Sequence, residues 1–192
     1  MTQQKKRRLS REDWILAGFR ALVRSGPPAL KAEPLARELK TTKGSFYWHF
    51  KDVADFEDAM LAYWRFRATQ QVIATVSQAS VSPQEDLHIL INLVTGFRDD
   101  AYGGLGAESA IRLWASTNPI VAKASREVDA ARLDYLTDRF AHAGFSVTQA
   151  LLFGQIMYGA LVGLEYLELQ NLGKAREGLT GLLDSLLSTD RI

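Results

Sequence analysis

The sequence predicts an all-α protein, and three observations support this fold class. Apolar residues recur at helical spacing along most of the chain, and no stretch keeps up the alternation expected of a β-strand. Proline, glycine and short polar residues fall between the periodic stretches, where helices start and stop. Of the 192 residues, 47% are hydrophobic, which is enough to bury a core in one domain or in a small domain beside a larger one.

The first third of the chain predicts three short helices and the start of a long one. Ser10, with an aspartate three residues later, is a start signal for the first helix, and Gly26 ends it. Pro34 can begin the second helix, because a first turn does not need that amide hydrogen. Thr42 is a suitable cap for the third helix and Asp52 for the long fourth helix.

The remainder of the chain predicts five further helices, about nine in all. The fifth opens at Pro83 and extends to about residue 100, and a glycine-rich loop at residues 102–106 separates it from a helix that ends near residue 117. The last three predicted helices span residues 119–143, 147–169 and 174–187.

Composition argues against several classes of site. The chain has no cysteine, which excludes disulfides, thiolate metal sites and cysteine nucleophiles and fits a reducing cytoplasm. Its histidines, His49, His88 and His142, are far apart and lack metal-binding spacing. The GxSxG, P-loop and HExxH motifs are absent. We therefore expect no enzyme activity, no metal and no cofactor.

The longest apolar stretch, residues 150–164, bears on the question of a membrane. It is too short and too interrupted for a spanning helix, so it predicts a buried one. The basic N-terminus has no apolar run behind it and is not a secretory signal. These features predict a cytoplasmic protein without a membrane partner.

The charge of the chain is unevenly distributed. The net charge is only +1, but residues 1–51 carry 12 Lys/Arg against 4 Asp/Glu, and residues 52–192 carry 11 against 18. We expect these two parts to be separate domains. A basic head on an acidic body indicates a polyanionic partner, although a solvated charged face with a basic tail gives the same counts. The basic run KKRR, residues 5–8, is either an arm that follows the minor groove or phosphates, or a disordered tail.

The segment TTKGSFYWHF, residues 41–50, is the most informative stretch. Phe46 and Phe50 are four residues apart, so they share a helix face and are expected to point into the core. About three residues separate this helix from the preceding one, and two short helices joined by so tight a turn form a helix-turn-helix, whose second helix can enter a DNA major groove. Tyr47 and Trp48 would then be exposed and able to touch thymine methyls, sugars and phosphates. The alternative is that both are core residues.

This segment resembles the TetR family of bacterial transcriptional regulators. The residues that carry the resemblance are LARELKTTKGSFYWHFKD, residues 35–52, and it extends through the first helix and into the fourth. The resemblance implies that eight residues contact DNA: Thr42, Lys43, Gly44, Ser45, Tyr47, Trp48, His49 and Lys51. Within this set it puts Lys43, Gly44 and Ser45 against base edges, and Thr42 and Tyr47 against phosphates. Trp48 and His49 would pack against the backbone or the bases, and Lys51 would anchor the far side.

The sequence departs from the family's pattern at three positions. Lys40 stands where glycine is usual, and a left-handed conformation there costs on the order of 1 kcal/mol relative to glycine. Val53 replaces a residue that is commonly basic, which removes one expected phosphate contact. Glu33 stands where a threonine or a similar donor often meets the DNA backbone, and its charge would repel phosphate.

The last two predicted helices form a candidate dimer seam. Their apolar residues exceed one inward stripe, and three glycines at 154, 159 and 163 would let another helix approach closely. The expected interface residues are Leu152, Ile156, Gly159, Leu161, Gly163, Leu179, Leu182, Leu183 and Leu186. The alternative is that these helices only cover the core of the monomer.

Large side chains between head and seam form a candidate ligand cavity. Its expected lining is Trp64, Phe97, Tyr102, Leu105, Trp114 and Tyr158, and the resemblance implies a small-molecule effector there. For each of these residues, ordinary core packing is the alternative.

The combined prediction is a homodimeric transcriptional regulator that binds an inverted-repeat DNA operator, a ligand-responsive repressor. Two alternatives belong to other classes. One is an all-helical small-molecule- or lipid-binding protein or enzyme without DNA binding. The other is a helical interaction module whose basic head binds an acidic protein.

Overall fold

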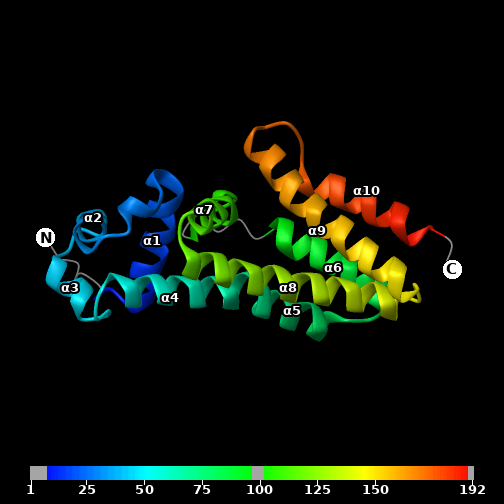
Figure 1. Ribbon diagram of the computed structural model, residues 1–192, viewed down its shortest axis with the longest axis horizontal. Helices are drawn as coiled ribbons and strands as arrows, with labels where there is room; N and C mark the ends of the chain where they lie inside the picture. The colour runs from blue at the N-terminus through cyan, green and yellow to red at the C-terminus, as the bar shows by residue number, and fades with distance from the viewer. Residues whose placement is uncertain (1–7, 97–101, 190–192) are drawn as a thin grey trace, which may run out of the picture. The chain divides into compact units, whose positions relative to one another are not determined.

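The computed structural model describes residues 8–96 and 102–189, and within these ranges the chain is all-helical, without a strand (Figure 1). The predicted fold class is confirmed. The helices are α1 (Arg11–Ser25), α2 (Ala32–Glu38), α3 (Lys43–Tyr47), α4 (Val53–Arg65), α5 (Gln71–Ala79), α6 (Pro83–Gly96), α7 (Gly106–Ala115), α8 (Pro119–His142), α9 (Val147–Leu169) and α10 (Ala175–Leu187).

The chain divides into two compact units. Unit 1 comprises Met1–Tyr63 and Asp99–Trp114, and unit 2 comprises Trp64–Arg98 and Ala115–Ile192. The predicted boundary after residue 51 lies earlier than this division, which falls inside α4.

The later division has its reason in the packing of α4. Phe56 and Met60 of α4 are fully buried, and they lie so close to α1 that a Cβ on Gly18 would be 2.5 Å from Phe56 Cζ and 2.6 Å from Met60 Sδ. Real Cβ atoms do not approach neighbours so closely, so a glycine at this position lets the two helices touch. The first part of α4 therefore belongs to the core of the head.

The helix signals predicted for unit 1 are confirmed at α1 and wrong at the start of α2. The Ser10 hydroxyl accepts a hydrogen bond from the Asp13 amide, and the Asp13 carboxylate accepts one from the Ser10 amide at 2.7 Å, which completes a capping box. Gly26 ends α1 with φ 71°. Helix α2 begins at Ala32 rather than at Pro34. Pro34 still lies in the first turn, where amide hydrogens have no intrahelical acceptor.

Helix α7 completes unit 1. The Tyr102 ring lies 4.5 Å from the ring of Phe19 and 5.9 Å from that of Tyr63, centroid to centroid. Gly103 and Gly104 follow with φ 98° and 59°, a left-handed pair that fits the predicted glycine loop. The loop is one residue shorter than predicted, because Gly106 already belongs to α7.

The predicted long fourth helix contains a π-helical segment, Phe66–Gln70, between α4 and α5. A π turn adds a residue and removes carbonyls from the regular hydrogen-bond ladder. Arg132 of α8 supplies donors there: its Nη2 lies 3.1 Å from the Ala68 carbonyl oxygen and its Nε 3.1 Å from Thr69 Oγ1. Counted as one rod, α4, the π segment and α5 bring the described chain to the predicted nine helices.

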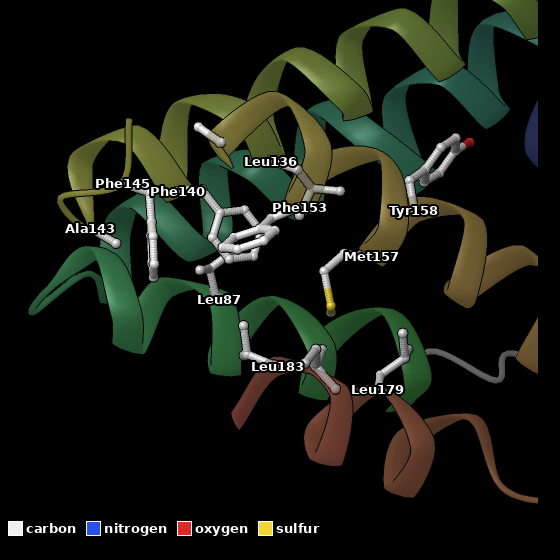
Figure 2. Close-up of a cluster of buried hydrophobic side chains, with 12 residues drawn as sticks. Leu87, Leu136, Phe140, Ala143, Phe145, Phe153, Met157, Tyr158, Leu179 and Leu183 are labelled. Atoms are coloured by element: carbon white, nitrogen blue, oxygen red, sulfur yellow. The ribbon is translucent and has the colours of Figure 1, made fainter. Parts of the chain in front are cut away.

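The core of unit 2 gathers side chains from α6, α8, α9 and α10 (Figure 2). Phe153 of α9 packs edge-on against Phe140 and Phe145, with centroids 5.6 and 5.2 Å away. Leu179 and Leu183 point into the same cluster from α10. Helices α8, α9 and α10 therefore cover a shared core.

Helix α9 is buried on one side only. The helix spans 23 residues and is long and apolar enough to cross a membrane by length and composition, so the prediction that this stretch is too short was wrong; 28% of its apolar window is buried. The inward side carries Phe153, Met157 and Tyr158, whose hydroxyl donates to Asp129 at 2.6 Å. The prediction of a buried helix therefore holds for that side, and the apolar outward side needs another explanation.

Candidate nucleic-acid interface

The turn between α2 and α3 positions the candidate recognition helix. Lys40 has φ 52°, the left-handed conformation considered for this position, so its cost of about 1 kcal/mol relative to glycine applies. The turn is closed by the Thr41 amide, which donates to the Ala36 carbonyl at 2.9 Å. Thr42 then caps α3, and its hydroxyl accepts from the Ser45 amide at 3.3 Å as predicted.

The aromatic side chains of α3 and the residues after it separate into two sides. Phe46 and Phe50 are buried, and Phe46 packs edge-on against Trp14 of α1 with centroids 5.4 Å apart. Tyr47 is 50% exposed and Trp48 is 80% exposed. The prediction that Phe46 and Phe50 are buried and that Tyr47 and Trp48 are exposed is confirmed. The two neighbouring rings of Tyr47 and Trp48 are therefore available to contact another molecule.

The other predicted contact residues lie on the same open side. Thr42, Lys43, Gly44 and Lys51 are exposed, and Ser45 and His49 are half-buried. Five of the eight line one shallow hollow of about 330 Å³, together with Arg8: Thr42, Gly44, Ser45, Trp48 and His49. The structure therefore brings most of the predicted set onto one surface, hereafter the reading surface. The sequence analysis named Arg8 only as part of the basic run at residues 5–8 and did not predict its position beside α3.

Arginines form ion pairs with two carboxylates of the head, those of Glu38 and Glu33. Glu38 at the end of α2 lies 3.2 Å from Arg20 Nε and 2.7 Å from Arg24 Nη2. Glu33, the residue expected to repel phosphate, is exposed and lies 3.8 Å from Arg37 Nη2 one turn along α2. This pairing offsets part of its repulsion. Val53 is half-buried at the first position of α4, where it offers no cation to a phosphate.

The predicted cavity residues belong to different parts of the structure. Trp64 and Tyr158 are in unit 2, and both rings face the guanidinium of Arg132, at 5.8 and 6.0 Å. Tyr102, Leu105 and Trp114 are in unit 1, where Tyr102 and Trp114 are buried. Phe97 lies outside the described residues. The cavity itself stays a prediction.

The predicted seam is partly wrong. Leu179 and Leu183 are fully buried in the core of their own unit, so they cannot meet a partner. Leu161, Leu182 and Leu186 pack against that core and stay partly exposed. The physical reason is that the spacing of apolar residues identifies the buried face of a helix. It does not show whether that face packs on its own unit or on a partner chain.

The remaining seam residues face outward. Leu152 and Ile156 of α9 are exposed, and a Cβ added to Gly159 or Gly163 would meet no atom of the described residues within 4 Å. Gly154, by contrast, is buried, with a Cβ position 3.0 Å from Thr137 Oγ1. Its role is therefore to let α9 approach α8, within the same unit. Leu152, Ile156, Gly159 and Gly163 define the outer face of α9.

No group of three His, Asp or Glu side chains able to hold a metal ion occurs within the described ranges. Within the same ranges, the chain is all-helical and has a helix-turn-helix in its N-terminal unit. No family model matches the chain, and no curated protein matches it.

Solved structures do match. A TetR-family transcriptional regulator from Streptomyces coelicolor is 17% identical, with a TM-score of 0.72 over 93% of this chain and 91% of that one. A Rhodococcus protein assigned to the same family is 22% identical, with a TM-score of 0.71 over 93% and 98%. The fatty acid degradation regulator FadR from Bacillus halodurans is 15% identical, with a TM-score of 0.72 over 97% and 99%. The chain has the TetR-family fold, so the resemblance drawn from residues 35–52 is confirmed at the level of the fold.

Proposed function

We propose that this protein is a DNA-binding transcriptional regulator of the cytoplasm, a homodimer that represses by occupying an inverted-repeat operator. The observation that carries the proposal is the reading surface. It combines an 80% exposed Trp48 with hydroxyls, a histidine and lysines on a head that is strongly basic. Phosphates and base edges are the partners that such a set of donors and rings recognises.

The first prediction concerns salt and Trp48. Binding to duplex DNA is expected to weaken linearly on a log–log plot against salt, with a slope of about 0.9 per phosphate contacted. Trp48→Ala is expected to weaken binding about tenfold, or about 1.4 kcal/mol, because it removes an apolar contact to sugar or base. Fluorescence anisotropy with a labelled operator selected from genomic fragments measures both.

The matched control for this prediction is Phe66→Ala. Phe66 is a 53% exposed ring on the π segment of unit 2, so Phe66→Ala also removes exposed apolar surface but leaves the residues of the reading surface unchanged. The affinity of Phe66→Ala for the operator should equal that of the wild type. Binding that does not respond to salt, or equal losses in the two variants, would rule out the proposed surface.

The proposed dimer rests on the outer face of α9. A glycine in a helix interior costs up to about 1 kcal/mol relative to alanine. Gly159 and Gly163 bear this cost although no atom in the described part of their own chain lies within 4 Å of a Cβ at either position. Close approach of a second helix, as in a symmetric four-helix interface, accounts for both glycines and for the exposed leucine and isoleucine beside them.

The second prediction tests the dimer. The wild type is expected to run at twice the chain mass of 21.4 kDa, and Ile156→Glu at the monomer mass, because a charge in the interface stays unpaired. Light scattering after size exclusion gives the mass. Val147→Glu is the control: Val147 is exposed nine residues earlier, on the opposite side of α9. A dimeric Ile156→Glu variant would contradict the proposed face.

Ligand response forms the last part of the proposal. We propose that a small molecule, bound in unit 2 beside the predicted cavity residues Trp64 and Tyr158, shifts the population toward a state with lower operator affinity. Trp64 and Tyr158 support this role because both rings face Arg132, a half-buried guanidinium that contacts the π segment. π segments are common at functional positions in helices.

A further inference from the structure

The hollow on the reading surface has one wall that does not come from α3. Arg8 supplies it from the segment that precedes α1, and α3 and the residues flanking it supply the rest. Arg8 is exposed, and the hollow has no carboxylate among its lining residues. A guanidinium, two hydroxyls, a histidine ring and an indole therefore face a space of about 330 Å³.

The start of α1 explains why Arg8 comes to lie there. Ser10 caps α1, so the chain leaves the helix immediately before it. Leu9 is half-buried and, with Trp14, occupies the two positions of a hydrophobic staple, which sets the direction of the preceding chain. Trp14 in turn packs on Phe46 of α3. The contact between α1 and α3 thus directs the segment before α1 toward α3.

Neighbouring arginines are already engaged by carboxylates. Arg11 lies 3.3 Å from Asp55 and 4.9 Å from the centre of the Phe50 ring, and Arg20 and Arg24 share Glu38. No ion pair of Arg8 occurs in the part of the chain that the structure describes. Among the described arginines of the head, Arg8 is therefore the one whose charge is left for an outside anion.

We propose that Arg8 is a DNA-contacting residue, and that the hollow holds a backbone phosphate between its guanidinium and the hydroxyls of Thr42 and Ser45. The inference rests on the proposed function and adds a residue from outside the helix-turn-helix to the reading surface. A phosphate fits because every polar group of the lining can donate a hydrogen bond, and because Arg binds phosphate with two parallel donors. It assigns one member of the basic run at residues 5–8 a defined contact.

The test measures the salt dependence of binding to a labelled 24-base-pair duplex of mixed sequence. For Arg8→Ala we expect the slope of log affinity against log salt to fall by about 0.9 per bound protomer, and affinity at 0.1 M salt to fall about eightfold per protomer. Arg8→Lys keeps the charge and should retain the slope. Arg126→Ala, which removes an exposed cation from α8, should leave slope and affinity unchanged. Circular dichroism should be the same for all variants.

Two further results separate a phosphate contact of Arg8 from a minor-groove contact, and the failure of this inference from the failure of the proposed function. Equal losses on an all-A·T and an all-G·C duplex support a phosphate contact, whereas a loss confined to A·T sequence would overturn it in favour of minor-groove reading. An unchanged slope for Arg8→Ala, while the wild type still binds DNA and responds to Trp48→Ala, would refute the inference and leave the proposed function standing. Wild-type protein that fails to bind any duplex at low salt would refute the proposed function.

Discussion

Phe46→Ala is expected to lower the stability of unit 1 by about 3–5 kcal/mol, the usual cost of removing a fully buried aromatic ring. Phe46 is 0% exposed, and its ring centre lies 5.1 Å from that of Phe50, 5.3 Å from that of Phe56 and 5.4 Å from that of Trp14. These partners come from α1, from α4 and from the end of the recognition segment. The cavity would therefore lie where the head is held together, and operator binding should be lost with the fold.

The measurement is hydrogen exchange of the amides in α1–α4 during urea unfolding. Tyr47→Ala is the matched control, because the next residue along the chain also carries a ring, half-exposed and 5.3 Å from that of Phe46. It should change protection little, by less than about 1 kcal/mol, while still weakening DNA binding. Unchanged protection in Phe46→Ala would mean that the aromatic cluster does not stabilise the head.

Local signals made the head predictable from its sequence. The capping residues Ser10 and Thr42 act on amides three residues away, so their effect can be read from the sequence. The same holds for Phe46 and Phe50, whose spacing of four residues decides which rings are buried. Once those two rings face inward, Tyr47 and Trp48 must face outward. The candidate reading surface follows from these short-range rules.

Long-range packing explains what the sequence did not predict. The π segment depends on Arg132, more than sixty residues further along the chain, which donates to Ala68 and Thr69. The burial of Leu179 and Leu183 depends on where α10 packs. The position of Arg8 beside α3 was not predicted for the same reason, because it depends on contacts between helices. The sequence did hold one signal for the position of Arg8. The next residue, Leu9, stands at the hydrophobic-staple position before the cap Ser10.

The buried ion pair of unit 2 leads to the last prediction. Asp86 of α6 is 1% exposed, and its Oδ2 accepts a hydrogen bond from Arg139 Nη1 of α8 at 2.9 Å. Hydrogen bonding to Asp138 raises the pKa of Arg139, partial desolvation lowers it, and the bond to Asp86 raises it again, with a net increase, so the guanidinium stays charged. Arg139→Met removes the one cation that pairs with this buried carboxylate among the described residues. We expect a loss of about 3–5 kcal/mol in the stability of unit 2.

The double variant Asp86→Leu/Arg139→Met separates the value of the pair from the cost of breaking it. Asp86 Oδ1 and Arg139 Nε lack hydrogen-bond partners among the described residues, so the desolvation of the pair is only partly repaid. Two apolar side chains of similar size should then restore most of the stability lost in Arg139→Met, or exceed the wild type by about 1–4 kcal/mol. Urea unfolding of the three proteins measures this. A double variant as unstable as Arg139→Met would show that the pair contributes net stability, because filling its site with apolar groups would not replace it.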